Sequence, residues 1–145
     1  MKEELIELIK QKVSEKIQKL ELLIAETRAS NNETKSSMGD KYETSREMLQ
    51  QQINGLQVQL NQHLKDRQLL LSIPIQQHKV IGMGSFVSTD KGKFFIAISL
   101  GELFYNDEKI FVISKESPLA QLMLGKRKGE MFEINNLIQI IKEIS

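Results

Sequence analysis

The chain has 145 residues, no cysteine and a formal net charge of +1, from 20 Lys and Arg against 19 Asp and Glu. This length accommodates one ordinary domain, or one small globular domain with a helical extension. Without cysteine, disulfide frameworks and thiolate zinc sites are excluded. A charge this close to zero gives no overall attraction to nucleic acid, so a charged partner must be recognised by a local patch.

The hydrophobic patterning gives no sign of a membrane partner. The N-terminal stretch MKEELIELIKQK lacks the apolar core and cleavage site of a signal peptide. The most apolar run, FFIAISLGELF, contains Gly101 and Glu102 and is too short to cross a bilayer as a helix. The absence of cysteine fits a reducing compartment. We therefore expect a cytoplasmic protein.

Residues 2–72 contain no proline and predict two long helices, each with a narrow apolar stripe at spacings of three and four. The first stripe comprises Ile6, Ile9, Val13, Ile17, Leu20 and Ile24. The second comprises Tyr42, Ser45, Leu49, Ile53, Leu56, Leu60 and Leu64, continued by Leu71. One helix alone would leave its stripe in water, whereas two helices folded back on each other bury both stripes.

The turn between these helices is predicted midway, in ASNNETKSSMGD, which is rich in Ser, Asn and Gly. The first half is therefore expected to be an antiparallel two-helix coiled-coil hairpin over residues 1–73, with its tip near residues 36–43. A helix of about 30 residues is about 45 Å long at 1.5 Å per residue. Such a rod is long for so small a protein.

After Pro74 the hydrophobic period changes to that of strands. HKVIGMGSFVS, KFFIAISL and KIFVIS predict antiparallel strands, separated by TDKGK and GELFYNDE, which carry turn residues. SPLAQLMLGK predicts a short helix with Ser117 as N-cap, Pro118 at its first position and Gly125 just beyond its end. MFEINNLIQIIKEI predicts a closing hairpin that turns at Asn135 and Asn136.

These elements predict an α+β protein whose second half forms a separate domain. The helical hairpin occupies residues 1–73, residues 74–77 form a junction, and residues 78–145 form a small domain of antiparallel strands with one short helix. No internal repeat is visible.

One stretch of the second half resembles a known family. ISKESPLAQLMLGKRKGEMFEI is similar to the C-terminal signature of the bacterial Gre transcript-cleavage factors, and the matching residues are Ser114, Ser117, Pro118, Leu119, Ala120, Gly125, Lys126 and Gly129. KVIGMGSFVS resembles the opening strand of the same domain. The motif resemblance covers residues 78–134, and the order of rod first and domain second extends it to nearly the whole chain.

The resemblance implies a fold, a partner and an activity. The C-terminal domain would have an FK506-binding-protein-like (FKBP-like) fold and would dock at the rim of the secondary channel of RNA polymerase. The coiled coil would enter that channel and stimulate cleavage of the 3′ end of backtracked nascent RNA. The protein would be a monomeric accessory factor and not an enzyme by itself. It would bind no cofactor when free, and would act together with the Mg²⁺ at the polymerase active site.

The stretch GDKYET places Asp40 and Glu43 three residues apart, on one face if the segment is helical. It resembles the family's Gly-Asp-x-x-Glu, whose acids help to hold a second Mg²⁺ for two-metal hydrolysis. The same two residues also fit helix capping, with Asp40 as N-cap and Glu43 at the third helical position. Capping and metal binding are compatible, since a capping carboxylate still points out of the end of the rod.

A second alignment changes the expected chemistry. In the family the Arg-Glu pair follows the acids some turns later, whereas here Arg46 and Glu47 follow almost at once. If Tyr42, Arg46 and Glu47 match the family's Tyr-x-x-x-Arg-Glu, its catalytic acids fall on Lys35 and Met38, and the tip is inactive. Three functions remain open: a cleavage factor, a non-cleaving secondary-channel regulator of the anti-Gre or DksA-like kind, and a coiled-coil adaptor that dimerises through the hairpin.

Basic residues supply two further sets of candidates. Cations that flank the tip and could contact phosphates of the extruded RNA are Arg28, Lys35, Lys41 and Arg46. Candidates for docking on an acidic surface of the polymerase are Ser117, Pro118, Lys126, Arg127 and Lys128. In both sets, simple solvation of the charges is the alternative. His63 and His78 have no second ligand at metal spacing, and the aromatic lining needed for a prolyl isomerase pocket is sparse.

Overall fold

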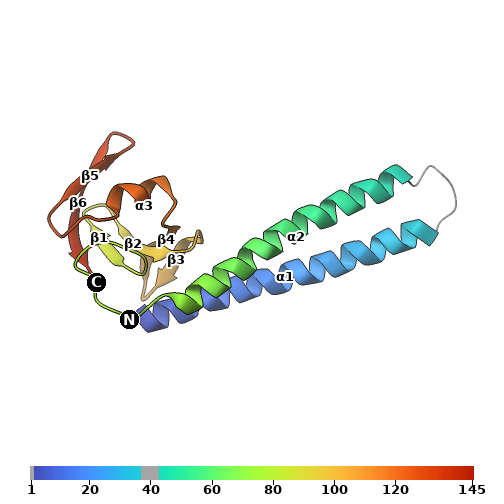
Figure 1. Ribbon diagram of the computed structural model, residues 1–145, viewed down its shortest axis with the longest axis horizontal. Coiled ribbons are helices and arrows are strands. Elements are labelled where there is room, and N and C mark those ends of the chain that lie inside the picture. The colour runs from blue at the N-terminus through green and yellow to red at the C-terminus, as the bar shows by residue number, and fades with distance from the viewer. Residues whose placement is uncertain (1, 37–42) are drawn as a thin grey trace. The chain divides into compact units, whose positions relative to one another are not determined.

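The computed structural model describes residues 2–36 and 43–145 (Figure 1). These residues form two compact units. One unit, Lys10–Gln68, is called here the hairpin unit. The other, called the globular unit, comprises the residues up to Ile9 together with Leu69–Ser145. The first residues of one long helix and the last residues of the other therefore group with the sheet.

Two long helices precede the sheet, as predicted: α1 spans Lys2–Ser36 and α2 spans Glu43–Ser72. Glu3 and Glu4 lie in the first turn of α1, where negative charge is favourable to the helix dipole. α2 ends ahead of Pro74, because a residue that precedes proline is disfavoured in helical conformation. α1 continues through residues 29–36, which belong to the polar segment expected to turn. Ser and Asn lower helix propensity only modestly, so they do not end a helix by themselves.

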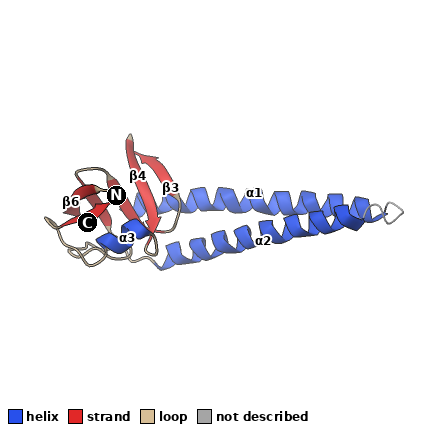
Figure 2. Cartoon of the chain, turned by 90° about the horizontal axis from the view of Figure 1, so that it is seen from above, coloured by secondary structure: helices blue, strands red, loops and turns tan. Residues whose placement is uncertain are grey.

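Within the hairpin unit the two helices run antiparallel beside each other in both views (Figures 1 and 2). The buried apolar residues of this unit are Val13, Ile17, Ile24, Ile53, Leu56 and Leu60. The described residues of this unit belong to α1 and α2 alone, so each stripe is covered by the opposite helix. This confirms the predicted mutual burial of the two stripes.

The predicted second stripe is wrong at its C-terminal end. Leu71 is 64% exposed, whereas Leu70 is 1% exposed. Leu69 and the residues after it belong to the globular unit. At its C-terminal end α2 is therefore buried by residues of the globular unit and not by the hairpin partner. The buried position there is Leu70, one residue before the position that the seven-residue repeat predicts.

The globular unit contains a six-stranded sheet of order β3-β4-β2-β1-β6-β5. Its strands are β1 Phe86–Thr89, β2 Lys93–Ala97, β3 Gly101–Tyr105, β4 Glu108–Ser114, β5 Met131–Ile134 and β6 Leu137–Ile144. All strand pairs are antiparallel except β2 with β4, which are parallel from Lys93↔Ile110 to Ala97↔Ser114. The sheet is thus mostly antiparallel, as expected, with one parallel pair that the sequence did not indicate.

The parallel pair follows from a strand that the sequence analysis missed. GELFYNDE was interpreted as a connection, but Gly101–Tyr105 forms β3 at the edge of the sheet. The chain then reverses at Asn106 and Asp107, which have φ of 51° and 62°. Because two reversals separate β2 from β4, these strands run in the same direction.

The sheet has buried side chains on both of its faces. On one face, α3 (Pro118–Met123) buries Ala120 and Met123, and the core cluster there comprises Ile81, Val87, Phe94, Ile96, Met123, Phe132 and Ile141. Phe95 is fully buried and points to the opposite face, since side chains alternate along a strand. The buried Leu5, Ile9 and Leu70 belong to the same unit and are available to cover that second face.

Local signals predicted the second half of the sheet well. The Ser117 side chain caps α3 by accepting a hydrogen bond of 3.2 Å from the Ala120 amide, and Pro118 opens the helix. Asn135 and Asn136, with φ of 53° and 64°, form the turn between β5 and β6. Both features depend only on neighbouring residues, which explains why the sequence predicts them.

The turn before β1 gives a test of the globular core. Gly84 has φ of +86°, and a Cβ there would lie 2.9 Å from the Ile73 Cγ2 atom. We expect Gly84→Ala to lower the free energy of unfolding by about 2 kcal/mol, because a left-handed backbone and a close contact are both unfavourable. The matched control is Gly82→Ala, where a Cβ meets nothing within 4 Å. Urea unfolding in which both variants lose the same stability would contradict this assignment.

Candidate functional site

The segment between α3 and β5 carries the glycines and lysine of the recognised motif. Gly125 and Gly129 adopt φ of 84° and 92°, which other residues rarely do. The Ile81 amide donates to the Lys126 carbonyl at 2.9 Å, and the Gly125 amide donates to the Ile81 carbonyl at 2.9 Å. The backbone of this segment is thus held against residues 80–82, and its side chains are left for other contacts.

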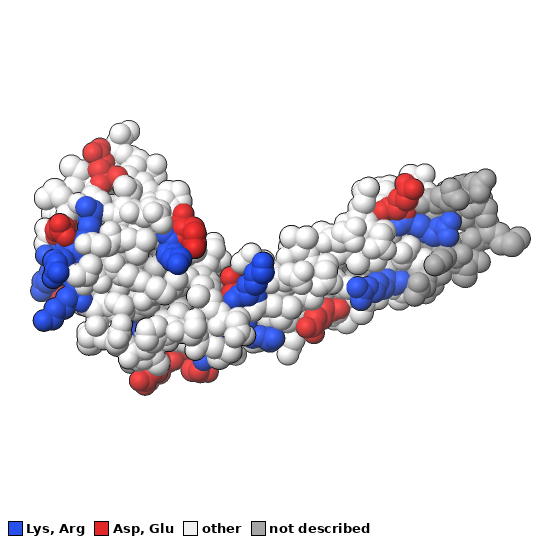
Figure 3. All heavy atoms as spheres, in the orientation of Figure 1, with Lys and Arg blue, Asp and Glu red and all other residues white. Residues whose placement is uncertain are grey.

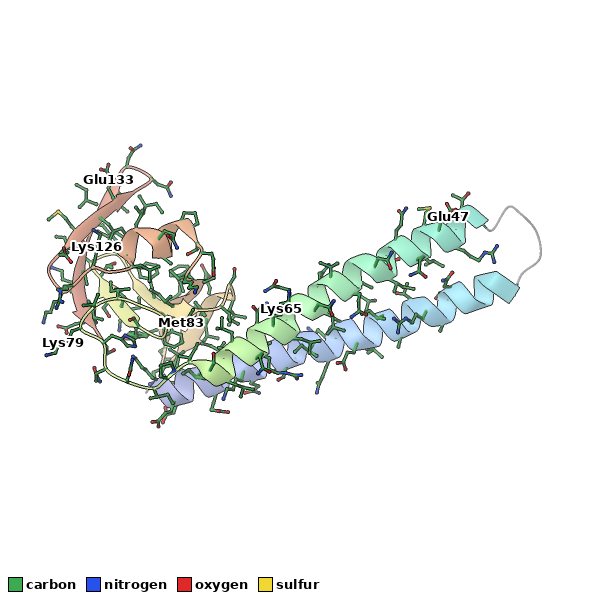
Figure 4. All side chains as sticks on the ribbon, viewed as in Figure 1. Glu47, Lys65, Lys79, Met83, Lys126 and Glu133 are labelled. Carbon is green, nitrogen blue, oxygen red and sulfur yellow. The ribbon has the colours of Figure 1, made fainter. Side chains whose placement is uncertain are left out.

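Four cations meet at this segment and form what we call the basic surface: Lys79, Lys126, Arg127 and Lys128. Lys79, Arg127 and Lys128 are exposed, and Lys126 is half-buried. Val80 pairs with Arg127 in an antiparallel bridge, so the backbone of Lys79 lies opposite that of Lys128. Lys and Arg gather on this side of the globular unit in Figure 3, where Figure 4 labels Lys79 and Lys126. The structure therefore adds Lys79 to the three cations that the sequence singled out.

Two carboxylates lie beside the basic surface. The Lys128 Nζ atom is 3.1 Å from the Glu143 carboxylate, and both side chains are exposed. A Glu130 oxygen accepts a hydrogen bond of 2.5 Å from the Arg127 amide. One acid therefore holds the turn and the other pairs with a single lysine, and the four cations remain in excess.

The remaining two docking candidates lie at the start of α3. The Ser117 hydroxyl serves as the helix cap, and Pro118 is exposed at the first helical position. Ser117 therefore has a structural role that explains its presence in the motif, and Pro118 is the accessible member of the pair.

An apolar depression of about 330 Å³ lies beside α3, and the sequence analysis did not identify it. Its lining consists of Lys91, Phe94, Phe111, Ile113, Leu119, Ile134, Asn135 and Gln139. The Phe94 and Phe111 rings stack with centroids 5.8 Å apart. Leu119 is a residue of the recognised motif and also lines the depression. The motif was therefore the sequence signal that could have pointed to this surface.

The β1–β2 turn is tied to β6 next to this depression. The Asp90 carboxylate accepts a hydrogen bond of 2.8 Å from the Ile140 amide. The Thr89 hydroxyl donates to the Gln139 side-chain oxygen at 2.8 Å. The Ile140 amide lowers the pKa of Asp90, and the nearby Lys91 lowers it further. These bonds position Lys91 and Gln139 at the rim.

Most of the predicted tip lies outside the described residues. Asp40 and Lys41 fall in that gap, as do Met38 and Tyr42 of the second alignment. Glu43 begins α2 and Lys35 lies in the last turn of α1, but their side chains are not described. Arg28 is exposed and Arg46 is half-buried near the start of α2. Both the capping and the metal-binding interpretation therefore remain predictions.

Residues 2–36 and 43–145 contain no group of three or more His, Asp or Glu that could hold a metal ion. In the same residues, no helix is both long and apolar enough to cross a membrane.

A buried lysine lies near the start of α1 in the globular unit. Lys2 is 8% exposed, and its Nζ atom donates to the Gln76 carbonyl at 2.6 Å. Burial lowers the pKa of Lys2. Burial, and then the charge of Lys2, lower the pKa of His78, whose buried Nε2 atom has no hydrogen-bond partner. The pKa of each group is therefore lower than in the unfolded chain.

No protein-family model and no curated protein matches the sequence. Among solved structures, GreA factor homolog 1 (Gfh1) of Thermus thermophilus is 14% identical, with 94% of each chain covered and a TM-score of 0.36. Thermus aquaticus Gfh1 is 16% identical, with 92% of each chain covered and a TM-score of 0.36. A structure described as the transcription factor Gfh1 is 15% identical, covers 92% of this chain and 89% of that chain, and gives a TM-score of 0.38.

The Asp90 bond predicts a specific acid sensitivity. Because its pKa is lowered from 3.8 in the folded protein, the unfolded chain takes up this proton more readily. The stabilisation is therefore present above about pH 5 and is lost as the pH falls below about 4. We expect Asp90→Asn, which keeps an acceptor for Ile140, to be less stable than the wild type at pH 6 and to approach it at pH 3. Urea unfolding at both pH values measures this, and an equal difference at both would refute it.

Proposed function

We propose that this chain is a Gre-like accessory factor of RNA polymerase, which inserts its helical hairpin into the secondary channel and stimulates cleavage of backtracked RNA. The main support for this proposal is that one chain contains both a two-helix hairpin and a globular unit. In the globular unit, the motif residues form a capped helix and a tightly held turn. The motif supplies the family resemblance, and the hairpin supplies the element that such a function needs.

The hairpin suits delivery of a functional group to the bottom of a pore. The α1 residues beyond Ile9 number 27 and would extend about 40 Å at 1.5 Å per residue. A single helix of this length, with one apolar stripe, would be poorly stable in water. Packing Ile17 and Ile24 against the other helix stabilises the element along much of its length. The two packed helices therefore form a supported rod.

The chemistry is proposed for Asp40 and Glu43, on the basis of the resemblance. With a polymerase-bound Mg²⁺ already present, two carboxylates would help to hold a second Mg²⁺, whose remaining ligands are water and RNA phosphate oxygens. Cations that would contact the RNA phosphates are Arg28, Lys35, Lys41 and Arg46. The protein would act in the cytoplasm as a monomer, with no cofactor of its own.

Docking is proposed to involve the α3 side of the globular unit, in the FKBP-like domain that the resemblance implies. Leu119 belongs to the motif and lines the apolar depression, so the recognised residues coincide with an accessible apolar surface. Pro118 is exposed at the same end of α3. Ser117 supports the helix from within.

A non-cleaving regulator of the same channel is the second candidate. Arg46 and Glu47 lie three and four residues into α2, and Figure 4 labels Glu47 near the start of this helix. This spacing departs from the family pattern and favours the alignment that places Lys35 and Met38 at the catalytic positions. Such a protein would dock in the same way and occupy the channel without supplying carboxylates to the metal.

The two candidates are distinguished by cleavage of end-labelled RNA in a stalled, backtracked complex of the cognate polymerase with Mg²⁺. For a cleavage factor, we expect the wild type to shorten the RNA and Asp40→Asn with Glu43→Gln to reduce the cleavage rate at least about 100-fold, because two metal ligands are lost. The control is Glu15→Gln with Glu21→Gln, which removes two exposed carboxylates from α1.

If the control variant cleaves as slowly as the tip variant, the effect comes from loss of charge and not from tip chemistry. If no variant cleaves but all of them block cleavage by a competing factor, the protein is a non-cleaving regulator. Absence of both effects would reject the proposed function.

Docking is tested with two variants of the same short helix. Leu119 lines the depression, whereas Leu122 is 38% exposed and does not line it. We expect Leu119→Gln to weaken binding to the polymerase about tenfold, because apolar contact area is lost, and Leu122→Gln to leave binding unchanged. Affinity is measured by titration against immobilised polymerase, with circular dichroism as a check of folding. Equal affinities for the two variants would exclude the depression as the docking surface.

A further inference from the structure

The basic surface on the globular unit has a charge pattern that neither the hairpin nor the apolar depression explains. We propose that Lys79, Lys126, Arg127 and Lys128 form a binding surface for the phosphate backbone of duplex DNA. This inference does not depend on polymerase binding, because the surface and its partner can be tested with the free protein.

Like charges lie opposite each other on the basic surface. The antiparallel bridge between Val80 and Arg127 places Lys79 opposite Lys128 on the neighbouring segment. Like charges at opposed positions destabilise a pair of strands. Here the fold brings Lys79 and Lys128 together. The shape of the connecting segment comes from the left-handed glycines Gly125 and Gly129 and does not require cations. The cations are thus unnecessary for the turn and are available to a ligand.

Acidic groups neutralise the basic surface only in part, since two carboxylates, those of Glu143 and Glu130, lie beside its four cations. Glu143 pairs with Lys128 in an exposed contact, which contributes little to stability and is easily exchanged. Glu130 is engaged with the Arg127 amide, so this acid supports the backbone of the turn. A surface that keeps its excess of positive charge attracts polyanions even though the whole chain is almost neutral.

The composition of the basic surface indicates the class of partner that it binds. The segment Gly125–Gly129 contains only glycine, lysine and arginine, and lysine is depleted from protein–protein interfaces, which centre on apolar and aromatic residues. Phosphate contacts require cations and carry no need for apolar side chains. Single-stranded nucleic acid is bound on aromatic stacking platforms, and residues 79–82 and 125–129 contain no aromatic side chain. Duplex DNA, with its dense and regular phosphates, is the partner that fits.

The test is fluorescence anisotropy of a labelled 20-base-pair DNA duplex titrated with the full chain at several KCl concentrations. We expect a dissociation constant of order 10 μM at 50 mM KCl, with log K falling against log [KCl] at a slope of about −3, as three or four phosphate contacts require. In the variant Lys79→Gln, Lys126→Gln, Arg127→Gln and Lys128→Gln, we expect affinity to fall at least tenfold and the slope to approach zero.

The matched control removes four exposed cations from the hairpin unit: Lys12→Gln, Lys16→Gln, Lys19→Gln and Lys65→Gln. It changes the net charge equally and should bind as the wild type does. Circular dichroism melting verifies that both variants are folded. Equal losses in the two variants would show a non-local charge effect and overturn the proposal, as would absence of wild-type binding at 50 mM KCl.

The polymerase titration separates this inference from the proposed function. If the basic-surface variant loses affinity for the polymerase while the wild type shows no affinity for duplex DNA, the surface is a protein-docking surface and the proposal is wrong. DNA binding that depends on these four residues supports it, whatever the cleavage assay shows.

Discussion

The hairpin depends on the mutual burial of two narrow apolar stripes. Val13, Ile17 and Ile24 on α1, and Ile53, Leu56 and Leu60 on α2, are the buried apolar side chains of a unit that contains only these two helices. Neither helix has another surface in that unit against which to pack, and isolated helices with a polar majority are marginal in water. The stripes therefore determine the antiparallel pairing of α1 with α2 within the hairpin unit.

The same helices also serve a second core. Leu5 and Ile9 of α1, and Leu70 of α2, are buried in the globular unit, where Phe95 points away from the α3 side of the sheet. A sheet of this length with one face uncovered would expose a large apolar surface. Burial of Leu5, Ile9 and Leu70 in the globular unit thus stabilises that unit and not the hairpin. This double use explains why the regular seven-residue repeat ends at Leu64 and why Leu70, rather than Leu71, is buried.

The parts of the fold that depend on neighbouring residues could be predicted from the sequence, and those that depend on distant pairing could not. Ser117 with Pro118 and the Asn135–Asn136 turn are local signals, and each forms the predicted element. The strand β3 was missed because Gly101 and the polar residues near Asn106 are typical of connections, although the alternation between them suits an edge strand. The parallel β2–β4 pair is a consequence of that strand and has no local signature.

The candidate sites divide along the same line. The motif around Gly125 was recognisable because its glycines and caps are dictated by backbone conformation, whereas Lys79 joins the basic surface only through the Val80–Arg127 bridge. The local sequence does not distinguish the two possible roles of the tip acids. A carboxylate at Asp40 suits a helix cap and a metal ion equally well. In the proposed function, the chemistry of the tip acids depends on a partner that supplies the metal and the phosphate. The globular unit can be interpreted from its own packing, whereas the proposed role of the hairpin end requires that partner.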